Sequence, residues 1–161
     1  MRSLRPSQKF CVRPATSDDF ASLLYMGEEA RKEGYAYFPP IDADWAVYNL
    51  NLLLMNYENG CAFVAEDKDM VFGFLIGRAD RFTFSRVRWA MGEIIYIIPS
   101  YRTKYPWASV SLLRRFMQWG KNVAKWQFFR MDNPHDLERK QKLLERVGLK
   151  PFGGPMFGVY E

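Results

Sequence analysis

One junction in the second half of the chain brings residues that could do chemistry close together in sequence. A strongly apolar run ends at Ile98, Pro99 breaks it, and a stretch with helical spacing begins near Trp107. The charged, polar or small residues around this junction are Glu93, Arg102, Thr103, Lys104, Ala108 and Ser109. The N-terminus of a helix has unpaired backbone N–H groups and a partial positive charge, which attract phosphate groups. The junction therefore predicts an anion site, with cations in its loop and a carboxylate in the strand before it.

The elements that precede this junction can be predicted from caps and periodicity. Phe10–Arg13 is typical of a strand, and Thr16 and Asp19 have the spacing of a capping box that starts a helix ending at Gly34. An aspartate at position 42 or 44 can cap a second helix, in which four apolar residues fall at helical spacing. These four residues are Trp45, Tyr48, Leu52 and Met55.

The remaining elements follow a meander. Two β-rich runs joined by Asp67-Lys68-Asp69 predict a hairpin, and the nearly continuous apolar run Trp89–Ile98 predicts a central strand. We then expect a helix over Trp107–Ala124, a strand over Trp126–Met131, a helix over His135–Val147 and one or two short strands at the end. Because three strands in succession precede the first crossover helix, neither a Rossmann nor a flavodoxin pattern fits.

Composition limits the classes of protein that the chain can be. Its 161 residues are 48% hydrophobic and 25% charged, which is the balance of a globular domain rather than of a disordered chain. We therefore expect one domain over residues 1–161, with residues 1–9 as a tail. No apolar run reaches the ~20 residues that span a bilayer, so we expect no membrane association and a cytoplasmic protein. One histidine with Cys11 and Cys61 is too small a set for a metal site, and buried free thiols are favoured over a disulfide.

Charge is divided unevenly along the sequence. Residues 14–70 contain 3 basic and 11 acidic side chains, whereas residues 101–161 contain 12 basic and 5 acidic ones. A basic half could meet nucleic acid or a phosphorylated cofactor, or it could be a solvated helix face. Arg114, Lys121 and Lys125 share one stripe of a helix, but no helix-turn-helix or other base-reading motif accompanies them. We therefore expect no specific binding to nucleic acid.

Over nearly its whole length the chain resembles the GNAT superfamily of N-acetyltransferases. Three segments resemble the family's opening strand and helix, its phosphate-binding strand, loop and helix, and its closing "Leu-Tyr-Glu-Lys-Leu-Gly-Phe" helix end: FCVRPATSDDF, MGEIIYIIPSYRTKYPWASVSLLRRFMQW and LLERVGLKPFG. Within the superfamily the resemblance is nearest to small phage-encoded GNAT-like proteins, which would act in the host cytoplasm. It implies a twisted, mostly antiparallel mixed sheet, with helices on both faces and a V-shaped split between Glu93–Ile98 and Trp126–Met131.

The resemblance also implies a cofactor, acetyl-CoA or coenzyme A, and roles for named residues. Backbone groups of Ile97 and Ile98 would pair with the pantetheine amides, and Asn133 resembles the family's asparagine that contacts the same arm. The residues implied at the phosphates are Arg102, Thr103, Lys104, Ala108 and Ser109. Glu93 resembles the family's general base, because an ammonium must lose a proton before its nitrogen attacks a thioester. The alternative for Glu93 is an ion pair with an arginine at position 78, 86 or 88.

The sequence departs from the family pattern at two places. The family loop reads Arg/Gln-x-x-Gly-x-Gly/Ala, but here Thr103, Tyr105 and Trp107 stand where glycine is expected, so the two aromatic rings and Pro106 could instead plug the groove. Leu144 stands where the family has the tyrosine that protonates the leaving thiolate. The tyrosines that could replace it are Tyr96, Tyr101, Tyr105 and Tyr160.

Two functions are compatible with these observations. The first is an acyl-CoA-dependent N-acyltransferase that acts on an amine, or a descendant that keeps the coenzyme A groove. The second is a catalytically inactive GNAT-like protein that binds another protein, as a homodimer or, for a phage protein, by binding a host enzyme. The second is motivated by the lost glycines, by Leu144 and by aromatic segments such as Tyr35–Phe38, since aromatic residues are enriched at interfaces.

Overall fold

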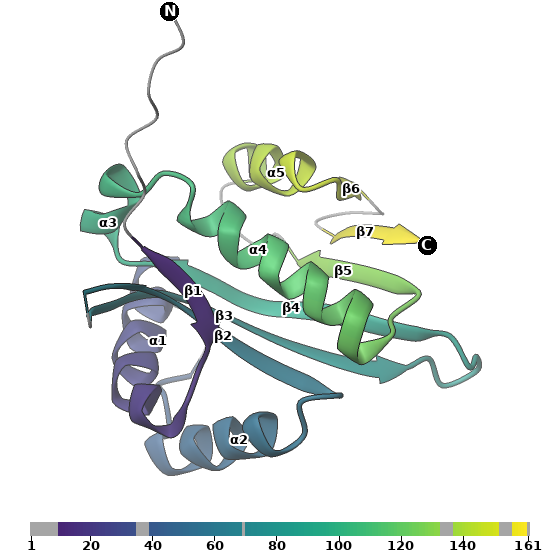
Figure 1. Ribbon diagram of the computed structural model, residues 1–161, viewed down its shortest axis with the longest axis horizontal. Helices are drawn as coiled ribbons and strands as arrows, with labels where there is room; N and C mark the ends of the chain where they lie inside the picture. The colour runs from purple at the N-terminus through teal and green to yellow at the C-terminus, as the bar shows by residue number, and fades with distance from the viewer. Residues whose placement is uncertain (1–9, 35–38, 69, 133–136, 152–155, 161) are drawn as a thin grey trace, which may run out of the picture.

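The computed structural model describes residues 10–34, 39–68, 70–132, 137–151 and 156–160. Within these ranges the chain forms one seven-stranded mixed sheet with helices on both faces (Figure 1). The strand order is β1-β2-β3-β4-β5-β7-β6, and only β4 and β5 pair in parallel. The α/β class and the mostly antiparallel mixed sheet expected from the sequence are confirmed.

Strands β2, β3 and β4 form the expected antiparallel meander, and β1 pairs antiparallel with β2. The last three strands complete the sheet after the crossover from β4. Short β6 lies at the far edge and pairs with β7. The strand bounds are β1 Cys11–Pro14, β2 Gly60–Asp67, β3 Met70–Arg81, β4 Arg88–Ile97, β5 Phe128–Asp132, β6 Lys150–Pro151 and β7 Met156–Tyr160.

Two cores lie on the two faces of the sheet. Helices α1 and α2 bury Leu23, Met26 and Leu53 against one face, while α4 buries Leu112 and Phe116 against the other, with α5 beside α4 (Figure 1). The helix bounds are α1 Phe20–Gly34, α2 Ala43–Met55, α3 Pro99–Lys104, α4 Ala108–Trp119 and α5 Leu137–Arg146. The helix expected from Trp107 is therefore α4, which ends at Trp119.

The sheet splits where β4 and β5 separate. The two strands pair from Trp89 with Phe128 to Gly92 with Met131, but β4 continues to Ile97 without β5 beside it. At the same point the register between β3 and β4 shifts, since Ile76 pairs with Ile94 and Gly77 with Gly92. Such a bulge bends a strand and increases its twist. The bulge thus marks the start of the V-shaped split, at Glu93.

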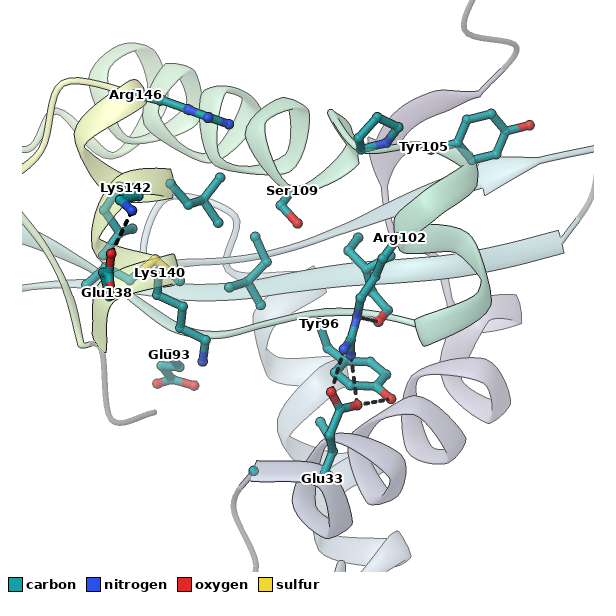
Figure 2. A pocket seen from close by; sticks show the side chains of 18 residues that line it. Glu33, Glu93, Tyr96, Arg102, Tyr105, Ser109, Glu138, Lys140, Lys142 and Arg146 are labelled. Carbon is teal, nitrogen blue, oxygen red and sulfur yellow. Dashed lines mark hydrogen bonds and ion pairs between the residues drawn. The ribbon is translucent and has the colours of Figure 1, made fainter. Parts of the chain in front are cut away.

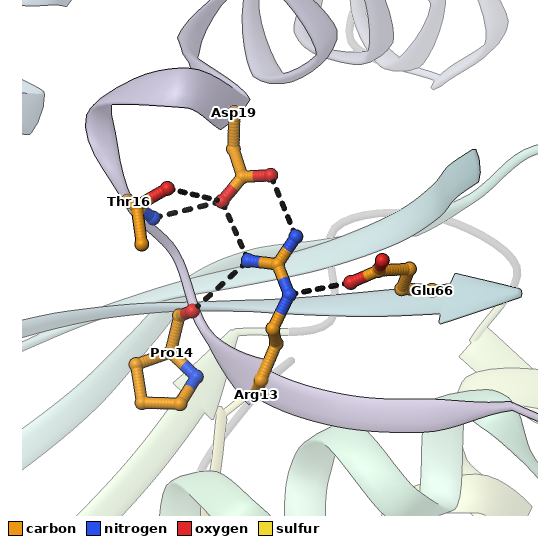
Figure 3. A network of polar contacts seen from close by, with 5 residues as sticks. All are labelled: Arg13, Pro14, Thr16, Asp19 and Glu66. Atoms are coloured by element: carbon orange, nitrogen blue, oxygen red, sulfur yellow. Dashed lines mark hydrogen bonds and ion pairs between the residues drawn. The ribbon is translucent and has the colours of Figure 1, made fainter. Parts of the chain in front are cut away.

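An arginine joins the start of the first helix to the sheet (Figure 3). Arg13 of β1 forms an ion pair with Asp19 at 2.7 Å and another with Glu66 of β2. Asp19 also accepts the backbone N–H of Thr16 at 2.8 Å and completes the expected capping box. Burial opposes the charged carboxylate, but the hydrogen bonds from Arg13 and Thr16 outweigh it and hold the pKa of Asp19 below its usual value. We call Arg13, Thr16, Asp19 and Glu66 the Arg13 cluster.

Three local features differ from expectation or add to it. Cys11 is exposed, because β1 is the edge strand, whereas Cys61 is buried, and both thiols are free. The periodic apolar residues of α2 lie outward, since Leu50 and Leu53 form its buried face; the outward residues are Trp45, Tyr48, Leu52 and Met55. The segment after α4 is a single π-helical turn over Gly120–Ala124.

Candidate functional site

A cavity of about 700 Å³ lies in the split between β4 and β5 (Figure 2). Its floor comes from β4, and its other walls come from the end of α1, from α3, from the start of α4 and from α5. Of the residues that the sequence analysis selected, Glu93, Ile97, Arg102 and Ser109 line this cavity. The structure therefore brings the strand, the loop cation and the helix start together around one space.

The backbone of β4 presents Ile95 and Ile97 to the cavity. The N–H of Ile98 donates to the carbonyl of Phe72 at 2.9 Å, and its carbonyl accepts the N–H of Tyr101 at 2.9 Å. Because backbone groups alternate between the two sides of a strand, those of Ile95 and Ile97 point away from β3 and into the split. The expected role of Ile98 does not fit this arrangement, since both of its backbone groups are already used. The backbone groups of Ile95, which the sequence analysis missed, face the split together with those of Ile97.

Arg102 lies at the cavity wall, but its guanidinium is already hydrogen-bonded to other groups of the protein. Its guanidinium donates to the carboxylate of Glu33 at 2.8 Å, and its Nε donates to the carbonyl of Ile97 at 2.8 Å. The hydroxyl of Tyr96 donates to the same carboxylate at 3.0 Å, and the guanidinium lies 5.3 Å from the Tyr96 ring centre. We call Glu33, Tyr96, Ile97 and Arg102 the Arg102 cluster. Sequence spacing could not have found Glu33, which lies on α1.

This cluster shifts the pKa values of its members. Hydrogen bonds from Arg102 hold the pKa of Glu33 below its usual value despite partial burial. Burial, and then the hydrogen bond to Glu33, raise the pKa of Tyr96 to about 12. At neutral pH Glu33 is therefore an anion paired with Arg102, and Tyr96 keeps its proton.

The rest of the expected phosphate loop lies away from the cavity. Lys104 pairs with Asp67 at 2.7 Å, and the hydroxyl of Tyr105 donates to the same carboxylate at 2.6 Å. Neither Thr103 nor Lys104 lines the cavity, so their expected contact with phosphate is not supported by their placement. The aromatic plug considered from the sequence does not form among the described residues. Tyr105 and Pro106 line the cavity, but the Tyr105 ring packs at a tilt against Phe72 and its hydroxyl bonds to Asp67, and Trp107 does not line the cavity.

The start of α4 offers donors to the cavity. Ala108 is fully buried, and its N–H already bonds to Tyr105, but the N–H groups of Ser109 and Val110 have no backbone partner within the described chain. Figure 2 shows the Ser109 hydroxyl directed into the cavity. Arg146 of α5, which the sequence analysis missed, also lines the cavity and lies 5.8 Å from the ring centre of Trp107 at the N-cap of α4.

The position of Glu93 is compatible with both interpretations of the sequence. Its carboxylate lines the cavity, and it also accepts the Nε–H of Arg78 on β3 at 2.5 Å. Arg88 instead bonds to Glu58 and Asn59. Because Arg78 binds one oxygen of the Glu93 carboxylate, the other oxygen is available to the cavity.

The α5 wall carries charge around a buried leucine. Leu144 is 3% exposed and lines the cavity, so a side chain without an ionisable proton stands at the position of the expected tyrosine. Lys140 and Lys142 also line it, and Lys142 pairs with Glu138 at 2.7 Å. Of the candidate tyrosines, Tyr96 and Tyr105 line the cavity, while Tyr101 stacks on Phe72. Asn133 and the side chain of Tyr160 lie outside what the structure describes.

Two further kinds of site were searched for in the described ranges. No group of three or more His, Cys, Asp or Glu side chains there could hold a metal ion. No helix there is long and apolar enough to cross a membrane.

Comparison with known proteins rests on structure, because the sequence matches no protein-family model and no curated protein. A proposed acetyltransferase from Salmonella typhimurium, solved with acetyl-CoA, has a TM-score of 0.77 at 14% identity over 95% of this chain and 94% of that one. An N-acetyltransferase from Staphylococcus aureus Mu50 gives 0.73 at 18% identity over 94% and 98%. A GNAT-family acetyltransferase from Streptococcus pneumoniae gives 0.72 at 15% over 94% and 99%.

The chain has the GNAT fold. The likeness spans nearly the whole of each chain, so the expected resemblance in fold is confirmed. At these identities it establishes the arrangement of elements, and the chemistry has to be argued from the cavity itself. In this GNAT fold the split, the start of α4 and Glu93 all border the same space.

Proposed function

We propose that the protein transfers an acyl group from acyl-CoA to an amine. The observation that carries this proposal is the cavity at the split, bounded by the unpaired edge of β4, the start of α4 and the carboxylate of Glu93 (Figure 2). Each of these three features supplies one requirement of the reaction: groups for an extended arm, donors for phosphates and an acceptor for a proton.

The residues present fit acetyl-CoA or coenzyme A. Backbone groups of Ile95 and Ile97 have the alternation that pairs with an extended chain of amides. The free N–H groups of Ser109 and Val110 at the positive end of α4, together with Arg146, suit the phosphates. The bound cofactor would supply the activated thioester. Arg102 already donates to the carbonyl of Ile97, so when the arm binds it either shares this two-lone-pair acceptor with the arm or releases it.

Glu93 is proposed to take the proton from the acceptor amine, directly or through a water molecule. An amine attacks a thioester only as the neutral base, so a carboxylate beside the reacting nitrogen accelerates the reaction. Arg78 holds this carboxylate in place from the neighbouring strand. Leu144 cannot donate a proton to the leaving thiolate, so that proton comes from another donor.

Thiol release from acetyl-CoA with a panel of primary amines tests the proposal. We expect Glu93→Gln to lower kcat by about 10²-fold or more while the Kd for coenzyme A stays unchanged, because the carboxylate acts on the amine rather than on the cofactor. Arg81→Gln, which removes one exposed charge at the far end of β3, serves as a control for fold and surface charge. Turnover that is unaffected by Glu93→Gln would remove this residue from the mechanism.

A second candidate, binding of another protein or a second copy of the chain, is favoured by the outward face of α2. Trp45 and Met55 are 64% and 83% exposed, and the rings of Trp45 and Tyr48 stack with centres 5.6 Å apart. Exposed aromatic groups of this kind suit an interface. Light scattering of the wild-type chain and of Trp45→Ser separates self-association through this face from a monomeric enzyme.

A further inference from the structure

Lys140 extends from α5 into the cavity. It is half-buried and lines the cavity, and Figure 2 shows its side chain directed toward Glu93 on the floor. Its charge also acts across the cavity on α1, since it adds to the stronger effect of Arg102 in lowering the pKa of Glu33. The ammonium group therefore stands in the field of carboxylates from two other elements.

Helical spacing explains why Lys140 lies on the cavity wall. Lys140 is four residues before Leu144, and residues at that spacing share one face of a helix. Because Leu144 is buried at the cavity wall, Lys140 is carried onto the same wall. Lys142 also lines the cavity, but it pairs with Glu138 and has a side chain that is 64% exposed.

The proposed function gives this position a chemical meaning. An acceptor amine must approach Glu93 from inside the cavity, and that is where the amine of Lys140 lies. We propose that Lys140 is itself an acyl acceptor, a primary alkyl amine that is acylated by acyl-CoA bound in the same cavity. This inference rests on the proposed function, since it requires the cofactor site.

The step balances without a further reactant. The ammonium of Lys140 gives one proton to Glu93, and the neutral Nζ attacks the carbonyl carbon of the thioester. A carbon–nitrogen bond forms and the carbon–sulfur bond breaks. The departing thiolate takes the second amine proton to give coenzyme A, and Glu93 releases its proton to water. The product is a neutral amide, so Glu33 and Glu93 lose a neighbouring cation.

Mass spectrometry of individual lysines tests the inference. The full chain is incubated with isotopically labelled acetyl-CoA, and acylation of each lysine is followed over time by peptide mapping. We expect Lys140 to react about tenfold or more faster than Lys142, because a held amine reacts at high effective molarity. Lys140→Arg should remove the fast component while keeping the charge, and Lys142→Arg should retain it.

A second readout needs no acyl transfer. Coenzyme A, which carries no acyl group, should protect Lys140 from reductive methylation by formaldehyde but not Lys125, which is exposed and does not line the cavity. If calorimetry shows that coenzyme A binds but Lys140 is neither acylated faster than Lys142 nor protected, the inference is overturned and the proposed cofactor site stands. If coenzyme A does not bind at millimolar concentration, the inference and the proposed function both fall. The comparison between lysines is made in the wild-type chain, so it does not depend on the folding of a variant.

Discussion

Arg13 and Arg102 both bind carboxylates, and of these two only Arg102 borders the cavity. In the Arg13 cluster the side chain of Asp19 is 5% exposed, and its partners join β1, β2 and the start of α1 (Figure 3). In the Arg102 cluster the side chain of Glu33 is 43% exposed, and its partners join α1, β4 and α3 at the cavity wall (Figure 2). The chemistry of the two pairs is the same, but their surroundings differ.

The difference separates a structural ion pair from one that competes with a ligand. The groups of the Arg13 cluster are satisfied by one another, and it does not line the cavity. In the Arg102 cluster the guanidinium binds Glu33 and the carbonyl of Ile97. An anionic cofactor with an amide arm would bind to the same guanidinium and the same carbonyl. Mutations in the first cluster should therefore change stability alone, whereas mutations in the second should change affinity.

The largest loss of stability is expected from Arg13→Ala. Removing this partner leaves the buried Asp19 without its cation, and we expect a loss of about 2 kcal/mol in the free energy of unfolding, at the low side for a buried pair because Arg13 is 34% exposed. Urea denaturation measures this loss. The affinity of the folded variant for coenzyme A should match the wild type, and a large change in affinity would break the distinction between the clusters.

The next largest effect should be a loss of stability in acid, caused by protonation of Asp19 in the Arg13 cluster. The pKa of Asp19 is lowered in the folded state, so its contribution to stability is present above the unfolded value of about 4 and is lost as the pH falls through the folded pKa. The free energy of unfolding of the wild type should therefore fall more steeply below about pH 4 than that of Asp19→Asn. Equal slopes would show that this carboxylate carries no pH-linked stability.

In the Arg102 cluster the two partners should have opposite effects on affinity. Arg102→Ala leaves an uncompensated carboxylate at the cavity and should weaken coenzyme A binding by about tenfold, whereas Glu33→Gln removes that carboxylate and should tighten binding about threefold. Isothermal calorimetry measures both. Because this pair is partly exposed, each change should cost about 1 kcal/mol of stability or less. Effects of the same sign would mean that Arg102 and Glu33 act only as a structural pair.

The smallest effect is expected from Tyr96→Phe. The hydroxyl is one of three donors to Glu33, and Arg102 provides the others, so its loss should cost about 0.5–1 kcal/mol of stability. Affinity for coenzyme A should change by less than about twofold, since no charge at the cavity is altered. A loss of turnover with affinity unchanged would instead assign Tyr96 a role in proton transfer.

The sequence predicts this fold well because its local signals agree with one another. Thr16, Asp19 and Gly34 set the start and end of α1, and the apolar run to Ile98 identifies the central strand. Which of Ile97 and Ile98 faces the split could not be predicted, because that depends on the register with β3, which is shifted by a bulge. A shift of the register by one residue reverses the direction of every backbone N–H and C=O group along the strand.

The cavity was only partly predictable for a related reason. Glu93, Arg102 and Ser109 are near one another in sequence, so one motif places them together. Glu33 and Arg146 reach the same cavity from α1 and α5, and no periodicity connects residues that far apart in the chain. The basic character of the C-terminal half was the one available signal for Arg146, but it could not distinguish a cavity wall from a solvated face.

The central claim, that the cavity at the split holds coenzyme A, is tested most directly by calorimetry on a charge variant at the start of α4. Ser109→Glu places a carboxylate where the phosphates are expected, while Gln118→Glu places the same charge on the exposed face near the other end of the helix. We predict that the wild type and Gln118→Glu bind coenzyme A alike, and that Ser109→Glu weakens binding by about 10²-fold or more. Equal binding by Ser109→Glu, or no binding by the wild type at millimolar coenzyme A, would contradict the claim.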